Sequence, residues 1–155
     1  MNVTRTFRWL ARRALIFGAI IGAGMAAYAL AVHAGIDGAS TVRRVALEEG
    51  VPAKLALAVA SVESGLDCEA PDSPAGAVGI MQTMPATAAA MGVSRAELLT
   101  CEGAARAGVR YLKAALDRTD GDRASAAHLY FAGLNAEPTR SSAYARAVMA
   151  AMHRF

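Results

Sequence analysis

The stretch "VPAKLALAVASVESGLD" (residues 51–67) decides the fold class of this chain. Small and apolar residues fill most of it, and leucine and valine recur on one face at helical spacing. Gly65 supplies a stop, because glycine readily adopts the left-handed conformation that ends many helices. The stretch therefore predicts a helix whose last turn carries a lone carboxylate, Glu63, directly after Val62.

The position of Glu63 suggests chemistry. The negative end of the helix dipole opposes ionisation there, and cover by apolar neighbours such as Met81 or Met84 would raise its pKa further. A carboxyl that keeps its proton near neutral pH can serve as a general acid. The alternative interpretation of this segment alone is a surface glutamate at a fraying helix end.

Other segments of the chain also carry helix start and stop signals. We expect the first of them to be capped by Ser40 or Thr41 and the last by Ser141 or Ser142. No stretch shows sustained alternation of apolar and polar residues, so strands should be absent or tiny. The sequence predicts an all-α or nearly all-α domain of about six short helices. Besides the helix already described, they are residues 42–49, 85–92, 94–98, 102–116, 123–132 and 142–152.

The N-terminus has the pattern of an export signal. Residues 1–13 hold four arginines and no acid, and residues 14–32 carry no charge. A basic start followed by an apolar run is typical of a signal peptide, although this run is also long enough to span a bilayer. We therefore expect residues 1–34 to be a cleaved signal or an N-in anchor in the inner membrane. In both cases residues 35–155 lie outside the cytoplasm, in the periplasm or an equivalent space.

The charge of the exported part argues against nucleic acid. Of the 16 Lys and Arg residues, four precede residue 14, whereas all 13 Asp and Glu residues follow residue 35. The exported part thus has 12 basic against 13 acidic residues and no basic excess to bind phosphates. Cys68 and Cys101 both lie in it, and an even cysteine count in an oxidising compartment predicts one disulfide. Neither cysteine has metal-site spacing, so we expect no metal.

A second stretch changes the interpretation of Glu63. "GAVGIMQTMPATA" (residues 76–88) follows "ES" (63–64) after a short loop. The pair resembles the soluble-type, goose-lysozyme-related lytic transglycosylases with an SLT domain. In that family a helix ends in Glu-Ser, and a loop leads to Gly-Ala-x-Gly-Leu-Met-Gln-x-Met-Pro-x-Thr-Ala. Ile80 replaces the leucine here.

Weaker similarities extend the resemblance over roughly residues 40–150. "AGVRYLKAAL" (107–116) is similar to the family's Gly-x-x-Tyr-Leu helix, and "AAHLYFAG" (126–133) is similar to its Ala-Tyr-Asn-Ala-Gly segment. Tyr144 resembles the start of its closing Tyr-x-x-x-Val. The resemblance implies a compact, lysozyme-like helical domain.

The resemblance also implies an activity on peptidoglycan. Its family cleaves the β-1,4 bond between N-acetylmuramic acid (MurNAc) and N-acetylglucosamine (GlcNAc) and forms a 1,6-anhydro ring, without cofactor or metal. Glu63 would act first as general acid and then as general base. Most glycosidases use two carboxylates, and the sequence offers no good second one.

Four further residues carry over as substrate-binding candidates. Ser73 matches a serine near the N-acetyl group, and Gln82 and Met84 match residues that line the sugar cleft. Tyr130 matches a tyrosine whose hydroxyl approaches the catalytic carboxylate. Ser73 has an alternative role as the cap of a turn.

Two positions depart from the family pattern. Phe131 and Ala104 stand where asparagines are usual, which leaves an inactive peptidoglycan-binding module as an alternative. A second alternative keeps the fold but changes the chemistry: a hydrolytic muramidase, in which water attacks in place of the C6 hydroxyl. In its lack of an accessory domain the sequence resembles the small enzymes that open the wall locally for secretion or conjugation machinery. We therefore take such machinery as a candidate partner.

Overall fold

Helices make up nearly all regular structure in residues 37–155, the part of the chain that the structure, a computed structural model, describes. Within this part no β-strand occurs, and extended pairing is confined to a single bridge between Val78 and Thr83. The expected all-α or nearly all-α fold is confirmed. The helices are α2 (Gly38–Glu48), α3 (Ala53–Ser64), α4 (Pro85–Ala90), α5 (Arg95–Leu98), α6 (Cys101–Arg118), α7 (Arg123–Ala132), α8 (Ala143–Ala151) and the 3-10 turn η1 (Met152–Arg154).

The predicted signal or anchor, residues 1–34 with its apolar run at 14–32, lies outside the described residues. Among the helices that are described, none is both long enough and apolar enough to cross a membrane. The described residues form one compact unit, Asp37–Phe155.

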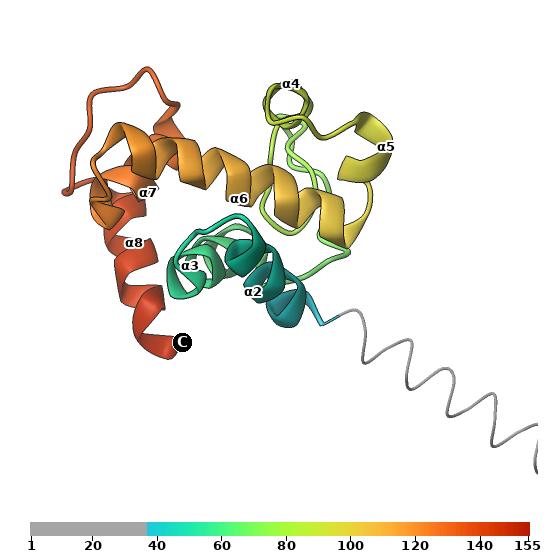
Figure 1. Cartoon of the computed structure of the whole chain (residues 1–155), viewed down its shortest axis with the longest axis horizontal. Coiled ribbons are helices and arrows are strands. Elements are labelled where there is room, and N and C mark those ends of the chain that lie inside the picture. The colour runs from blue at the N-terminus through green and yellow to red at the C-terminus, as the bar shows by residue number, and fades with distance from the viewer. Residues whose placement is uncertain (1–36) are drawn as a thin grey trace, which may run out of the picture. The chain divides into compact units, whose positions relative to one another are not determined.

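Helix α6 is the longest of the described helices and crosses the whole unit (Figure 1). Helices α2 and α3 pack together on one side of it, α4 and α5 lie near its N-terminal end, and α7 and α8 follow at its C-terminal end. Helix α3 also contacts α8. Helix α3 therefore packs against an element from each half of the described chain, α2 and α8.

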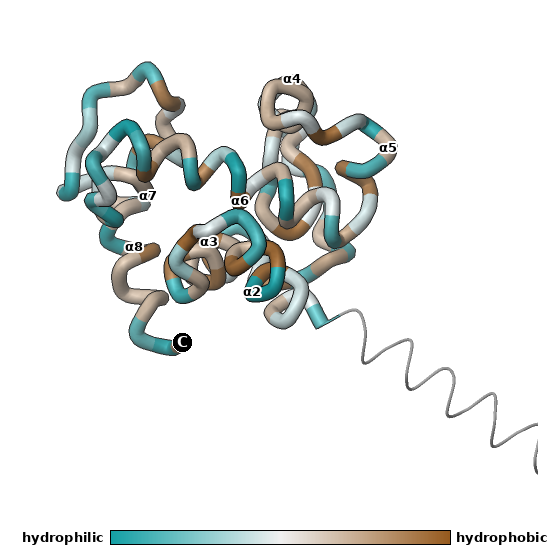
Figure 2. The backbone as a smooth tube through the Cα atoms, viewed as in Figure 1, coloured by the Kyte–Doolittle hydropathy of each residue, from teal (hydrophilic) through white to brown (hydrophobic). Residues whose placement is uncertain are grey.

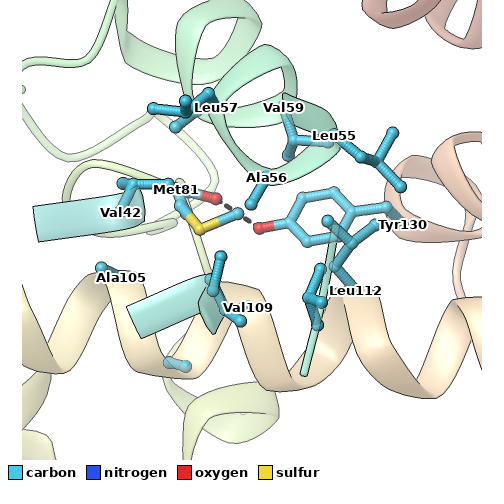
Figure 3. Close-up of a cluster of buried hydrophobic side chains, with 14 of the residues drawn as sticks. Val42, Leu55, Ala56, Leu57, Val59, Met81, Ala105, Val109, Leu112 and Tyr130 are labelled. Carbon is cyan, nitrogen blue, oxygen red and sulfur yellow. Dashed lines mark hydrogen bonds between the residues drawn. The ribbon is translucent and has the colours of Figure 1, made fainter. Parts of the chain in front are cut away.

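Helix α3 is the centre of the core. Its residues 55–60 are all buried, and a helix that is apolar on every side belongs inside a domain. Figure 2 shows this apolar character as brown segments along α3. In Figure 3 Leu55 and Val59 of α3 lie in one cluster with Val109 of α6 and Tyr130 of α7. Alanines fill many remaining core positions and let the helices approach closely.

The start of α2 differs from the prediction. The N-cap is Asp37, not Ser40 or Thr41, and its carboxylate accepts from the backbone N–H groups of Ala39 and Ser40, both at 3.2 Å. The Ser40 hydroxyl instead donates to the Asp37 carbonyl at 2.9 Å. An aspartate that satisfies two free N–H groups outcompetes a serine further along the chain. The predicted cap Ser142 of α8 is confirmed.

Two sets of contacts fasten the N-terminal half to α6. Arg106 of α6 pairs with Glu48 of α2 at 2.9 Å and with the adjacent Glu49 at 3.1 Å. The predicted disulfide joins Cys68 to Cys101 over a sequence separation of 33 residues. It ties the loop after α3 to the first residue of α6.

Candidate active site

Glu63 stands where the sequence predicts it, in the last turn of α3. Gly65 ends the helix in the left-handed region at φ 69°. Its N–H bonds the Ser61 carbonyl at 3.1 Å, and the next N–H, of Leu66, bonds the Ala60 carbonyl at 3.3 Å. These two bonds satisfy carbonyls that a helix end leaves free, so the backbone that carries Glu63 is fixed.

Ser64 joins the two halves of the sequence pattern. Its hydroxyl donates to the Ile80 carbonyl at 2.7 Å, which links the end of α3 to the loop that contains "GAVGIMQTMP". The same oxygen accepts from the Asp67 N–H at 3.2 Å. The serine after the glutamate thus positions the loop against the carboxylate, a role that sequence reasoning did not assign to it.

The loop itself has a shape that only particular residues allow. Gly79 has φ +73°, and a Cβ there would lie 2.6 Å from the Cβ of Ala104. Gln82 also has a positive φ, 44°, and its side-chain amide donates to the Gly79 carbonyl at 3.0 Å and to the Pro71 carbonyl at 3.4 Å. Both partners of this amide are backbone carbonyls of the same loop, so Gln82 holds the loop in its shape.

A cleft of about 440 Å³ opens beside Glu63. It is of the size that small-molecule sites usually have. All five residues that the sequence singled out for the site border it. The residues that line the cleft are Glu63, Ser73, Ala75, Ala77, Gln82, Thr83, Met84, Thr87, Tyr111, Tyr130, Phe131, Ala132 and Gly133.

The environment of Glu63 favours its protonated form. Burial raises the pKa of its carboxyl above the ordinary value, because a buried charge loses its hydration. A hydrogen bond that the Tyr144 hydroxyl donates to Oε1 opposes this shift and lowers the pKa, but burial is the larger effect. Burial likewise raises the pKa of Tyr144, so its hydroxyl keeps the proton that it donates.

The tyrosine on the carboxylate is not the expected one. The Tyr130 hydroxyl donates to the Met81 carbonyl at 2.7 Å, as Figure 3 shows, and Tyr144 of α8 occupies the place beside Glu63. Tyr130 is 8% exposed, and burial raises the pKa of its phenol. Its ring meets that of Tyr111 edge-on, with centroids 5.4 Å apart. Tyr130 thus builds the floor of the cleft.

The remaining predicted residues have mixed roles. Ser73 closes a turn, because its hydroxyl accepts from the Ala77 N–H at 3.0 Å, and it also borders the cleft. Met81 is fully buried and belongs to the core, whereas Met84 is 42% exposed at the cleft. That Ser73, Gln82, Met84 and Tyr130 contact substrate stays a prediction.

The two departures from the family pattern fall in different places. Ala104 is 1% exposed and packs where a Cβ on Gly79 would lie, so it belongs to the core and not to the cleft. Phe131 borders the cleft and is 70% exposed. Its ring stacks on that of Tyr144.

Sequence reasoning connected Tyr144 with the last helix but gave it no role at the site. Tyr144 and Glu63 are 81 positions apart in the sequence, and no local sequence pattern relates positions so distant. Among the described residues that line the cleft, Glu63 is the one carboxylate. No group of three or more His, Cys, Asp or Glu side chains in the described part of the chain is placed to hold a metal ion.

The described residues thus define a small helical domain with a cleft built around one protonatable carboxyl. A sequence model of the transglycosylase SLT domain matches residues 40–149, and the chain belongs to this family. The fold is also similar to the X-ray structure of an inactive mutant of the lytic transglycosylase Slt from Pseudomonas aeruginosa, with a TM-score of 0.63 and 22% identity. That match covers 73% of this chain and 23% of the other, so this chain spans less than a quarter of that protein. The expected family is confirmed.

Proposed function

We propose that this chain is a peptidoglycan lytic transglycosylase that cleaves the MurNAc-β-1,4-GlcNAc bond and leaves a 1,6-anhydro-MurNAc end. The observation that carries the proposal is the Glu63 carboxyl, whose pKa burial raises, at the wall of a cleft of about 440 Å³. Membership of the SLT domain family supports the choice of substrate.

The reaction needs one carboxyl in two successive roles. Protonated Glu63 gives its proton to the glycosidic oxygen, the bond between that oxygen and C1 of MurNAc breaks, and GlcNAc leaves as an alcohol. The carbonyl of the substrate's own N-acetyl group supports the positive charge that develops at C1. The Glu63 carboxylate then takes the proton of the C6 hydroxyl as O6 bonds to C1. This closes the anhydro ring and restores the starting acid.

The surroundings of Glu63 suit both steps. Burial favours the proton in the first step, since the pKa of a general acid works best near the operating pH. The Tyr144 hydroxyl stabilises the carboxylate that the first step leaves. Because the cleft offers no second carboxylate among the described residues, neither a direct nucleophile nor a separate base is assigned.

The location and partners follow from the sequence. The basic start and the apolar run at residues 14–32 would deliver residues 35–155 to the peptidoglycan outside the cytoplasm, secreted or held at the inner membrane. A secretion or conjugation machine that needs the wall opened locally stays our candidate partner.

Product analysis tests the proposal. The full chain, its Glu63→Gln variant and a Glu69→Gln control are incubated with purified peptidoglycan, and the soluble products are identified by mass spectrometry. We expect anhydro ends from the parent and the control, and a loss of at least about 100-fold in the Glu63→Gln variant. The control changes an exposed glutamate of the neighbouring loop that does not border the cleft.

Three other outcomes would contradict the proposal in different ways. Reducing ends would identify a hydrolytic muramidase, in which water attacks C1 in place of the C6 hydroxyl. Binding without cleavage would identify an inactive peptidoglycan-binding module. Full activity of the Glu63→Gln variant would remove Glu63 from the mechanism.

A further inference from the structure

The exposed aromatic ring at the rim of the cleft is not used by the chemistry above. Phe131 is the penultimate residue of α7 and is 70% exposed. Few large apolar side chains among the described residues are exposed to this degree, and it is the aromatic one. An exposed ring loses the benefit of burial unless something covers it.

One face of this ring is already occupied. Phe131 stacks on Tyr144 with ring centroids 5.0 Å apart and an angle of 19° between the planes. Tyr144 is held in turn by the hydrogen bond from its hydroxyl to Glu63. The stack therefore fixes the Phe131 ring relative to the carboxyl that would do the chemistry.

The rest of the ring is open to the cleft. Phe131 borders the cleft, whereas Tyr144 does not. Met84 and Tyr111 add apolar surface to the same cleft. Glu63 and Gln82 supply polar groups. Apolar walls with a few polar groups are the usual composition of a ligand site.

We infer that Phe131 is a sugar-stacking residue, whose free side packs against the C–H face of an N-acetylhexosamine ring of the glycan strand. The inference rests on the proposed function. The face of an aromatic ring is partially negative, and the ring C–H groups of a pyranose are partially positive. In the proposed reaction the bond next to Glu63 joins two sugar rings, and Phe131 lines the same cleft as Glu63, so a sugar ring is the occupant that we assign to it.

The stack needs a flat ring and not only apolar bulk. Phe131→Tyr keeps the ring, Phe131→Leu keeps the bulk, and Phe131→Ala removes both. Leu47→Ala is the matched control, because Leu47 is exposed to nearly the same degree, 68%, and does not border the cleft. Since both wild-type side chains are exposed, all four variants should fold, which thermal melting verifies.

Binding is measured without turnover. Each change is made in the full chain carrying Glu63→Gln, and the proteins are sedimented with purified peptidoglycan whose stem peptides have been removed. We expect the dissociation constant to rise about threefold to tenfold for Phe131→Ala and Phe131→Leu. Phe131→Tyr and Leu47→Ala should match the parent.

Kinetics of the same changes in the chain with Glu63 intact give the second readout. Loss of a sugar contact made in the bound ground state should raise KM and leave kcat nearly unchanged. Unchanged binding with a lower kcat would overturn the inference, because Phe131 would then act only as a support for Tyr144. Equal binding by the Leu and Tyr variants would also overturn it, as apolar bulk would suffice.

The two proposals can fail separately. Ring-dependent binding by a parent chain that cleaves nothing would keep the stacking inference and reject the activity. Cleavage with binding that is indifferent to residue 131 would keep the activity and reject the stacking. No binding of glycan by the Glu63→Gln chain would overturn the stacking inference.

Discussion

Replacing Ser64 by alanine tests whether one hydrogen bond holds the two halves of the site together. The Ser64 hydroxyl donates to the carbonyl of Ile80 at 2.7 Å, and Ile80 is fully buried. Its removal leaves a buried acceptor without this donor, which costs about 1–3 kcal/mol. For a unit of about 120 residues, each kcal/mol of lost stability lowers Tm by about 4 °C. We therefore expect Ser64→Ala to lower Tm by about 4–12 °C.

The activity should fall as well. Ile80 lies two residues before Gln82 on the loop that forms one wall of the cleft, so a shift of this loop moves the wall relative to Glu63. Misplacement of binding groups by about 1 Å can cost about 100-fold in rate. We expect kcat to fall by at least about tenfold, measured as release of soluble peptidoglycan fragments by enzyme that circular dichroism shows to be folded.

Ser61→Ala is the matched control for this change. Ser61 lies on the same helix, three residues earlier, and its hydroxyl accepts from Arg154 at 3.0 Å in an exposed place. Loss of that contact should change stability by no more than about 0.5 kcal/mol. If Ser64→Ala melts with Ser61→Ala and retains full activity, the proposed link between helix and loop is wrong.

Three further perturbations probe the site and its frame. Tyr144→Phe removes the hydroxyl that lowers the pKa of Glu63, so the alkaline limb of the kcat/KM profile should move to higher pH; an unmoved limb would rule out this coupling. Cys101→Ala removes the disulfide to Cys68, and for a loop of this length the free energy of unfolding should fall by about 3–4 kcal/mol and Tm by about 15 °C. Dithiothreitol should lower the Tm of the parent by a similar amount and leave the Tm of the variant unchanged. Gly108→Ala places a Cβ 2.4 Å from the Cβ of Met81, and this overpacking should lower the free energy of unfolding by about 1–3 kcal/mol. Urea unfolding measures this loss as a lower midpoint. An unchanged midpoint would mean that the packing around Gly108 is looser than the structure has it.

The elements of this fold were predictable where the signals are local. A glycine after an apolar helical stretch marked the end of α3, as the structure confirms. The helix predicted at residues 94–98 is also present as α5, where Ser94 and Glu97 form a capping box. The start of α2 was misplaced because Asp37, Ser40 and Thr41 all have side chains that can cap. The hydrogen bonds that the Asp37 carboxylate accepts from the N–H groups of Ala39 and Ser40 show where the helix begins.

For the candidate site, the sequence indicated which side chains lie near one another but not which hydrogen bonds they make. The resemblance of residues 63–64 and 76–88 to a known family singled out side chains that border one cleft in the structure, and their contact with substrate stays a prediction. The hydroxyl that bonds the Glu63 carboxylate is that of Tyr144, whereas Tyr130 bonds the Met81 carbonyl, and nothing in the sequence tells which of the two tyrosines reaches the carboxylate. Contacts over such separations depend on how α3, α7 and α8 pack.

The half-buried carboxyl of Glu63 has a consequence for folding. The pKa of Glu63 is higher in the folded chain than in the unfolded chain. At a pH below both values the carboxyl is protonated in both states and does not reduce the free energy of unfolding. As the pH rises above the pKa in the unfolded chain, the carboxyl ionises in the unfolded chain but stays protonated in the folded one. The free energy of unfolding therefore falls until the pH passes the pKa in the folded chain. At neutral pH the raised pKa of Glu63 therefore favours the unfolded chain, and the Cys68–Cys101 disulfide acts in the opposite direction.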